Sequence, residues 1–251
     1  MKIPLILFPG LACTQRLFAP QKEGLDDIAN VIVPDWVEPS RADSLQMFAS
    51  RWGAAVWERY FASGLLSADD GCFVGGLSFG GMVSPLVGKL LHDKGVHVHG
   101  AIRLATFRCG DEIPERFRWI WSSLNLFPGG GWYVSKIYCA LVLRSLGGRL
   151  SFARREVYQQ VLESPARRSI EVVRMLAQWR GAEPIFDFPI LQIHGARDML
   201  LPIRYTSPQI TIPRAGHCLT LTQPSEVNEA IREFLLTRNA QHKTTQQTDL
   251  Q

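Results

Sequence analysis

Short runs of apolar residues alternate along the chain with longer segments in which apolar residues recur every three or four positions. The short runs predict buried strands, at residues 3–8, 31–33, 72–77, 98–105, 188–194 and 209–212. Helical patterns separate them, for example at 45–56, where Asp43 or Ser44 is a suitable N-cap. Further helices are predicted at 82–91 and from about Pro224 onward. This alternation is typical of a mostly parallel sheet covered by helices on both faces, an α/β fold.

Residues 111–181 interrupt the alternation. They contain no strand-like run but show three or four helical segments, two of which flank the glycines at 129–131. We therefore predict a core made of residues 1–110 and 182–238, with a helical insertion at 111–181 between the fourth and fifth strands. The polar residues 239–251 are expected to form a disordered tail.

Composition narrows the classes of function. The net charge of +4 is too small to imply nucleic-acid binding, and no segment reaches the ~20 apolar residues of a membrane span. The five cysteines are scattered, odd in number and without a C-x-x-C pair, which argues against a zinc site or a disulfide framework. A reducing cytoplasm is the expected location, and no cofactor or metal is implied.

The stretch "GGLSFGG" ends the predicted strand at 72–77 and begins a helix. In a G-x-S-x-G motif the serine stands on a sharp strand-to-helix turn, and glycine two residues to either side avoids a collision. Here Gly76 and Gly80 flank Ser78. The stretch lacks the lysine of a Walker loop and the G-x-G-x-x-G of a dinucleotide site. Ser78 is therefore the candidate nucleophile.

A serine hydroxyl needs a base, and the base needs a carboxylate that fixes its tautomer. His217 lies between the last predicted strand and the last helix, and Asp198 directly follows the fifth strand. The order Ser78, Asp198, His217 is that of an α/β-hydrolase triad. Two backbone N–H groups should stabilise the oxyanion, those of Phe79 after the nucleophile and Leu11 in the loop after the first strand.

The chain resembles the α/β-hydrolase superfamily over nearly its whole length. "GLSFGG" resembles the nucleophile elbow, "HGARDMLLP" the acid segment, "AGHCLTLTQPSEV" the histidine segment and "FPGL" the oxyanion loop. The resemblance implies a sheet of about six strands in the order 2-1-3-4-5-6. It also implies that the insertion at 111–181 is a cap that covers the substrate.

The chain departs from the family pattern in three places. It begins at what would be the third strand, so the usual N-terminal antiparallel strands are expected to be missing. Pro9 stands where a histidine is common. Asp198 and His217 are only 19 residues apart, so the helix between the last two strands is expected to shrink to a turn. The short spacing leaves Asp111 or Glu112 as an alternative orienting acid.

The insertion is rich in aromatic residues, most of which should pack it onto the core. Candidates to line an apolar acyl pocket are Trp119, Trp121, Phe127 and Trp132. Residues 103–180 carry 13 Lys or Arg against 6 Asp or Glu. A solvated helical face is the simplest explanation of this charge. An anionic substrate or an acidic carrier protein is the functional alternative.

The sequence thus predicts a cytoplasmic serine hydrolase that cleaves a small to medium carboxylic ester or thioester. One alternative is a lyase or C–C hydrolase that uses the same triad. Another is a non-catalytic protein of this fold that binds a ligand under its cap. Cys218, next to His217, is expected to make the protein sensitive to thiol reagents.

Overall fold

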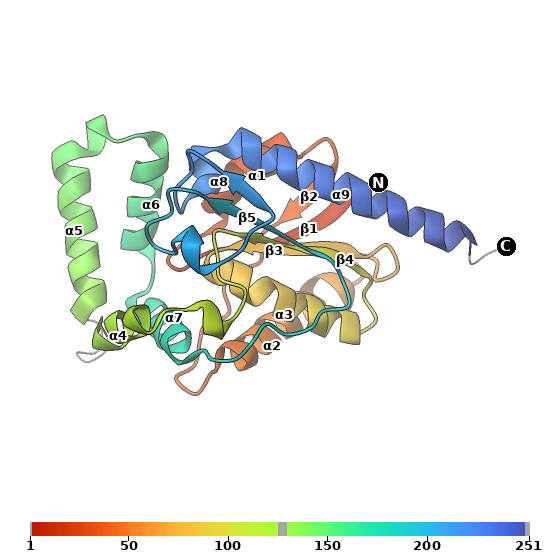
Figure 1. Ribbon diagram of the computed structural model, residues 1–251, viewed down its shortest axis with the longest axis horizontal. Coiled ribbons are helices and arrows are strands. Elements are labelled where there is room, and N and C mark those ends of the chain that lie inside the picture. Colours follow the sequence, from red (N-terminus) through yellow and green to blue (C-terminus); the bar gives the residue numbers. More distant parts are fainter. Residues whose placement is uncertain (1, 125–129, 249–251) are drawn as a thin grey trace.

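Six strands form one parallel sheet in the computed structural model, which describes residues 2–124 and 130–248 (Figure 1). The strand order is β2-β1-β3-β4-β5-β6, and every neighbouring pair is parallel. The strands are β1 Ile3–Phe8, β2 Ala29–Ile32, β3 Cys72–Leu77, β4 Val98–Leu104, β5 Ile190–Gly195 and β6 Ile210–Ile212. The predicted order and the parallel sheet of six strands are confirmed.

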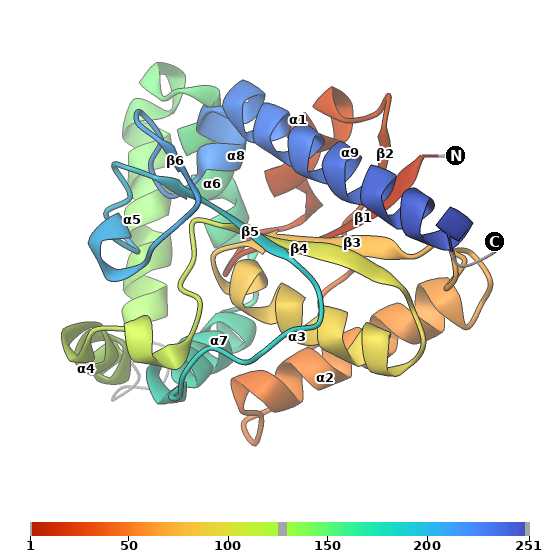
Figure 2. The same ribbon diagram turned by 45° about the vertical axis from the view of Figure 1, so that its right-hand side comes forward.

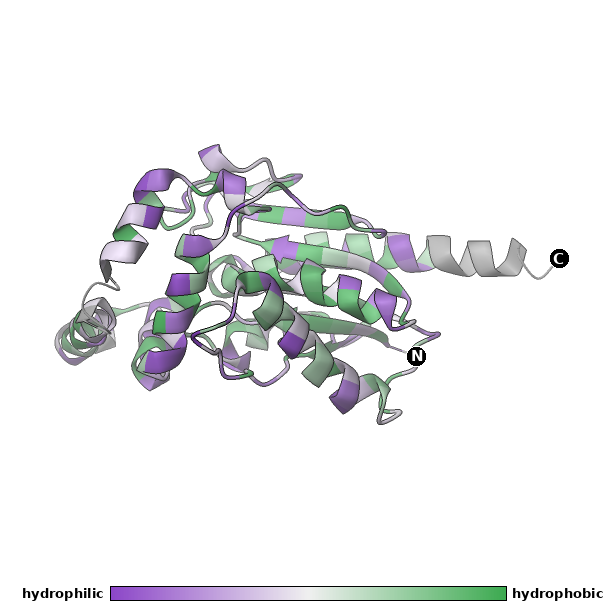
Figure 3. Cartoon of the chain, turned by 90° about the horizontal axis from the view of Figure 1, so that it is seen from below, coloured by the Kyte–Doolittle hydropathy of each residue, from purple (hydrophilic) through white to green (hydrophobic). Residues whose placement is uncertain are grey.

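Both faces of the sheet are buried, as the apolar runs predict. In β1, Leu5 and Leu7 belong to the hydrophobic cluster on one face and Ile6 and Phe8 to the cluster on the other, all with no exposed surface. Alternate side chains of a strand point to opposite faces, so an uninterrupted apolar run requires cover on both. In Figure 3 the strands are mostly hydrophobic, whereas the helices around them carry hydrophobic and hydrophilic segments.

Helices provide this cover (Figures 1 and 2). On one face lie α2 Leu45–Val56, which continues as a π-helical turn Trp57–Phe61, and α3 Phe79–Asp93. On the other face lie α1 Ala19–Gly24, α8 Leu219–Thr222 and α9 Pro224–Thr248. The Ser44 side chain caps α2 by accepting a hydrogen bond from the Met47 N–H at 3.1 Å. The cap predicted at Asp43 or Ser44 is therefore Ser44.

In the described part of the chain between β4 and β5 lie four α-helices, which we call the helical insertion: α4 Glu115–Leu124, α5 Gly130–Leu146, α6 Phe152–Glu163 and α7 Ala166–Gln178. They lie beyond the carboxyl ends of the strands, where α5 and α6 run side by side (Figure 1). Between β5 and β6 the described chain holds only a short 3₁₀ helix, Ile203–Tyr205, as the spacing of Asp198 and His217 predicts.

α9 continues to Thr248 and so extends into residues 239–251, where the sequence predicts a disordered tail. After Ser225 the helix meets neither proline nor glycine, so no residue interrupts its backbone hydrogen bonds. α3 also begins earlier than predicted, at Phe79, since the turn at Ser78 leads into the helix without a linker.

Candidate active site

Ser78 occupies the turn between β3 and α3 in a backbone conformation that few residues other than glycine adopt. Its φ is +56° and its ψ is −120°. Such a conformation costs about 1–3 kcal/mol and persists only where the surroundings enforce it. The Ser78 N–H donates to the Leu104 carbonyl at 2.8 Å, and the Thr106 hydroxyl donates to the Ser78 carbonyl at 2.8 Å. These bonds anchor both sides of the strained residue to the end of β4.

The glycines around Ser78 are required by close backbone contacts. A Cβ atom on Gly80 would lie 2.0 Å from the carbonyl oxygen of Phe8, and one on Gly76 would lie 2.4 Å from the carbonyl carbon of Gly80. Gly81 is confined as well, at 2.8 Å from Thr106 Cγ2. The turn can form only with glycine at these positions, which is the physical basis of the G-x-S-x-G pattern.

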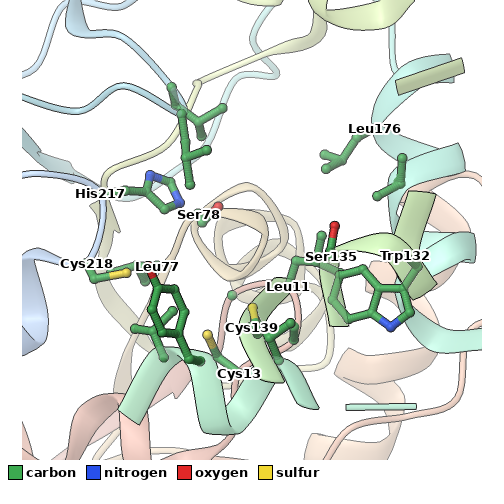
Figure 4. Close-up of a pocket in the computed structure, with 18 of the residues that line it drawn as sticks. Leu11, Cys13, Leu77, Ser78, Trp132, Ser135, Cys139, Leu176, His217 and Cys218 are labelled. Carbon is green, nitrogen blue, oxygen red and sulfur yellow. The ribbon is translucent and has the colours of Figure 1, made fainter. Parts of the chain in front are cut away.

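His217 and Asp198 form the second part of the site. The Nδ1 atom of His217 lies 2.8 Å from Asp198 Oδ2, in a hydrogen bond between the loops that follow β5 and β6. An ionised carboxylate only accepts, so Nδ1 carries the proton and Nε2 is left as the basic nitrogen. In Figure 4 the His217 ring is turned toward Ser78, and the side chains of His217 and Ser78 line one cavity.

Asp198 is buried and held by several donors. Its Oδ1 accepts from the N–H groups of Leu200 and Leu201, each at 2.9 Å, and His194 Nε2 lies 3.3 Å from Oδ2. Burial alone would raise the pKa of the Asp198 carboxyl. The hydrogen bonds from His194, His217 and the Leu201 N–H outweigh burial and hold the pKa well below its usual range. The carboxylate is therefore ionised at neutral pH.

The alternative acids are engaged elsewhere. Asp111 is exposed and its Oδ1 accepts from the Gly181 N–H at 3.0 Å, while Glu112 pairs with the N–H and guanidinium of Arg108. Of the three carboxylates considered from the sequence, Asp198 is the one that contacts His217.

The loop after β1 lies against Ser78. A Cβ atom on Gly10 would come within 3.4 Å of Ser78 Cβ, and Leu11 lines the cavity. Trp36 Nε1 donates to the Cys13 carbonyl at 2.9 Å, and the Thr14 N–H donates to Gln160 Oε1 of α6 at 2.7 Å. Core and helical insertion thus hold the loop from two sides.

Phe79, the first residue of α3, brings its backbone N–H to a helix start, where such groups lack partners within the helix. Its ring is fully buried and packs on Trp36 and Phe48 at centroid distances of 5.9 and 5.6 Å. This packing fixes the peptide that follows Ser78. The N–H groups of Leu11 and Phe79 remain the candidates for an oxyanion hole.

A cavity of about 640 Å³ extends from Ser78 into the helical insertion. From the core, Leu11, Leu77, Met82 and Leu201 line it, and from the helical insertion come Trp121, Trp132, Val134, Tyr138, Val157, Tyr158, Val161, Val173 and Leu176. None of the described residues that line it is Lys, Arg, Asp or Glu. The walls are therefore almost entirely apolar, apart from a few hydroxyl groups, three thiols and His217.

Two of the four aromatic residues predicted to line a pocket, Trp121 and Trp132, do so. Trp119 does not: its side chain is 74% exposed, because two residues along a helix turn it by about 200° away from Trp121. Phe127 lies outside the described residues.

Several arginines of segment 103–180 pair with carboxylates. Arg103 contacts Glu183, Arg168 contacts Glu38, and Arg174 pairs with Glu171 at 2.8 Å. Glu38 and Glu183 lie outside the segment, so part of its positive charge is balanced by other regions of the chain.

Three cysteines, Cys13, Cys139 and Cys218, also line the cavity, and all are free thiols. Burial raises the pKa of each, that of Cys218 to about 11 with a further contribution from the Asp198 carboxylate. Thiolates are the reactive form. The sensitivity to thiol reagents expected at Cys218 is therefore opposed by its raised pKa.

Sequence reasoning did not find the residues that support the site. Thr106, which bonds the Ser78 carbonyl, in turn receives a hydrogen bond from Gln192 at 2.9 Å on its own carbonyl. His194 is a second such residue: its Nε2 lies 3.3 Å from Asp198 Oδ2 and donates to the Leu201 carbonyl at 2.7 Å. Its position four residues before Asp198, at the end of a strand, was the available signal.

No protein-family model and no curated protein sequence matches the chain. Among solved structures, a thermophilic esterase from Thermogutta terrifontis matches with a TM-score of 0.67 and 21% identity, over 95% of this chain and 91% of that one. An N-acyl homoserine lactonase, AidH, in complex with N-butanoyl homoserine matches with a TM-score of 0.65 and 16% identity, over 95% of this chain and 90% of that one. An alpha/beta hydrolase fold protein from Burkholderia ambifaria matches with a TM-score of 0.62 and 19% identity, over 92% of this chain and 90% of that one. At these identities the similarity is one of fold.

Within the described residues, no helix is long and apolar enough to span a membrane.

Proposed function

The chain has the α/β-hydrolase fold, and on this premise we propose that it is a serine hydrolase acting on carboxylic esters or thioesters. The observation that carries the proposal is the 2.8 Å hydrogen bond between His217 Nδ1 and Asp198 Oδ2, beside a serine on a strained turn that opens into the same cavity. This arrangement of nucleophile, base and carboxylate suits acyl transfer.

In the proposed reaction, Ser78 Oγ attacks the carbonyl carbon while His217 Nε2 takes the hydroxyl proton. The N–H groups of Leu11 and Phe79 stabilise the oxyanion of the tetrahedral intermediate. The ionised Asp198 stabilises the imidazolium and keeps it oriented. Collapse of the intermediate breaks the bond to the alcohol or thiol, which receives the proton from His217. An acyl group then remains on Ser78.

Hydrolysis of the acyl-enzyme repeats these steps with water as the nucleophile. His217 takes a proton from the water molecule, the resulting oxyanion is held by the same two N–H groups, and Ser78 leaves with the proton from His217. Besides the substrate and water, the proposed steps use side chains and peptide groups of this chain. The five free cysteines fit the reducing cytoplasm as the place where the enzyme works.

The test is labelling with a fluorophosphonate, measured by intact mass, on wild type, Ser78→Ala and His217→Ala. We expect one adduct on wild type, none on Ser78→Ala and much slower labelling of His217→Ala. A panel of esters, thioesters and C–C substrates on the unlabelled wild-type enzyme then separates the hydrolase from the lyase alternative. Absence of an adduct on folded wild-type protein would contradict the proposal and favour a non-catalytic binding protein.

A further inference from the structure

The cavity above Ser78 continues away from the reaction centre into the space between α5, α6 and α7. Val134 and Tyr138 of α5, Val157 and Val161 of α6, and Val173 of α7 line this part of the cavity. Branched aliphatic side chains and aromatic rings give a surface that favours hydrocarbon over water.

The size of the cavity exceeds what a short acyl group needs. Its volume is about 640 Å³. A water-sized group takes about 30 Å³ in a liquid, so the cavity holds roughly 20 such groups. An acetyl or butyryl ester would leave most of the apolar wall without a partner, whereas a chain of eight or more carbons would cover a much larger part of it.

The charge of the walls selects against a charged chain. Among the described residues that line the cavity there is no Lys or Arg to pair with an anion and no Asp or Glu to pair with a cation. An ionised carboxylate carried into this space would lose its hydration without gaining a partner, which is strongly unfavourable.

The entrance is apolar as well. Val134, Tyr138 and Leu200 line the cavity and are at the same time 66%, 59% and 65% exposed. They make the cavity wall apolar where it reaches the surface, at α5 and at the loop after β5.

Building on the proposed hydrolase activity, we infer that the cavity is an acyl pocket for an uncharged hydrocarbon chain of about eight carbons or more. The anionic group considered from the charge of segment 103–180 is then confined to the leaving-group side of the substrate. Val161 of α6 and Val173 of α7 line the cavity from two helices, so a larger side chain at either position should shorten the usable chain.

The experiment compares p-nitrophenyl esters from acetate to palmitate, and the octanoate with a half-ester of the same length that ends in a carboxylate. Each methylene that enters the pocket should raise kcat/KM by about threefold to fourfold, up to the limit of the cavity. We expect the octanoate to exceed the acetate by at least 100-fold and the carboxylate-ended ester by at least tenfold. A preference for acetate, or equal rates with the charged ester, would overturn the inference.

Variants of the wall locate the pocket. Val161→Trp and, separately, Val173→Phe should move the preferred chain toward fewer carbons. Gln159 belongs to α6, as Val161 does, but its side chain is exposed and does not line the cavity. Gln159→Trp is therefore the matched control and should leave the chain-length profile unchanged. A wild-type profile in both wall variants, with melting temperatures retained, would also overturn the inference.

Two readouts separate this inference from the proposed activity. Fluorophosphonate labelling of Ser78 reports the activated serine without reference to chain length. Displacement of an apolar fluorescent probe by 1-decanol and by 1-butanol reports the pocket without catalysis. Decanol should bind at least tenfold more tightly than butanol in wild type, and Val161→Trp should abolish the difference. Labelling without this preference refutes the acyl pocket alone. The preference without labelling refutes the hydrolase proposal alone.

Discussion

Replacement of Asp198 by asparagine keeps the shape of the side chain but changes what its outer atom offers to His217. The N–H groups of Leu200 and Leu201 both donate to Oδ1, so this site must remain an oxygen. The amide nitrogen of the asparagine therefore takes the place of Oδ2, 2.8 Å from His217 Nδ1. An NH₂ group donates only, so Nδ1 must accept and the ring proton moves to Nε2.

In Asp198→Asn the His217 nitrogen that faces Ser78 is therefore protonated. With its proton on Nε2, His217 cannot take the proton of Ser78, and the stabilisation of the imidazolium by a carboxylate is lost as well. The same substitution in a serine protease triad lowers kcat by about 10⁴. We expect kcat of Asp198→Asn to fall by roughly 10³ to 10⁴, which is about 4 to 5.5 kcal/mol of transition-state stabilisation. KM should change little, because Asp198 does not line the cavity.

The assay is steady-state hydrolysis of p-nitrophenyl octanoate with separate kcat and KM values. Asp111→Asn is the matched control, since it changes the other candidate acid in the same way while leaving His217 untouched. Melting temperatures show whether the variants are folded. If Asp198→Asn retains kcat within tenfold of wild type, Asp198 does not orient the base and the assignment of the triad fails.

Three further predictions follow from the geometry. Gly80→Ala should lower the free energy of unfolding by about 3 kcal/mol or more, because its Cβ would lie 2.0 Å from the Phe8 carbonyl, whereas Gly148→Ala, with open space, should stay within about 0.5 kcal/mol in urea titrations. Alkylation of Cys218 by iodoacetamide at pH 8 should be roughly 100-fold slower than that of a free thiol, because its pKa is raised to about 11; equal rates by peptide mass spectrometry would contradict this. The lowered pKa of Asp198 stabilises the fold above about pH 4, and this contribution is lost as the pH falls toward the lower pKa of the folded state. Asp198→Asn should therefore lose less unfolding free energy than wild type between pH 6 and pH 3, and parallel profiles would contradict the expectation.

Local patterns were sufficient to predict the sheet and the order of the candidate triad. An apolar run such as 72–77 can be satisfied only by burial on both faces, and the spacing of Gly76, Ser78 and Gly80 follows from contacts within one turn. The positions of Asp198 and His217 directly after strands bring them to the same edge of the sheet, because parallel strands end together.

Packing contacts between elements that are distant in the sequence could not be predicted in this way. Trp119 and Trp121 are equally aromatic, and only the packing of α4 on α7 decides that one is exposed and the other lines the cavity. The role of His194 depends on a carbonyl seven residues away that the loop after β5 folds back toward it. Both depend on tertiary contacts that no single segment encodes.

Two faces of helix α6 contact different parts of the site. Glu156, Gln160 and Glu163 hold the loop after β1 through Thr14 and Arg16, whereas Val157, Tyr158 and Val161 face the cavity. Because 3.6 residues make one turn, neighbouring positions belong to different faces. A family of descendants could therefore vary the wall residues freely and acquire new substrates, while the anchoring residues keep the reaction centre fixed.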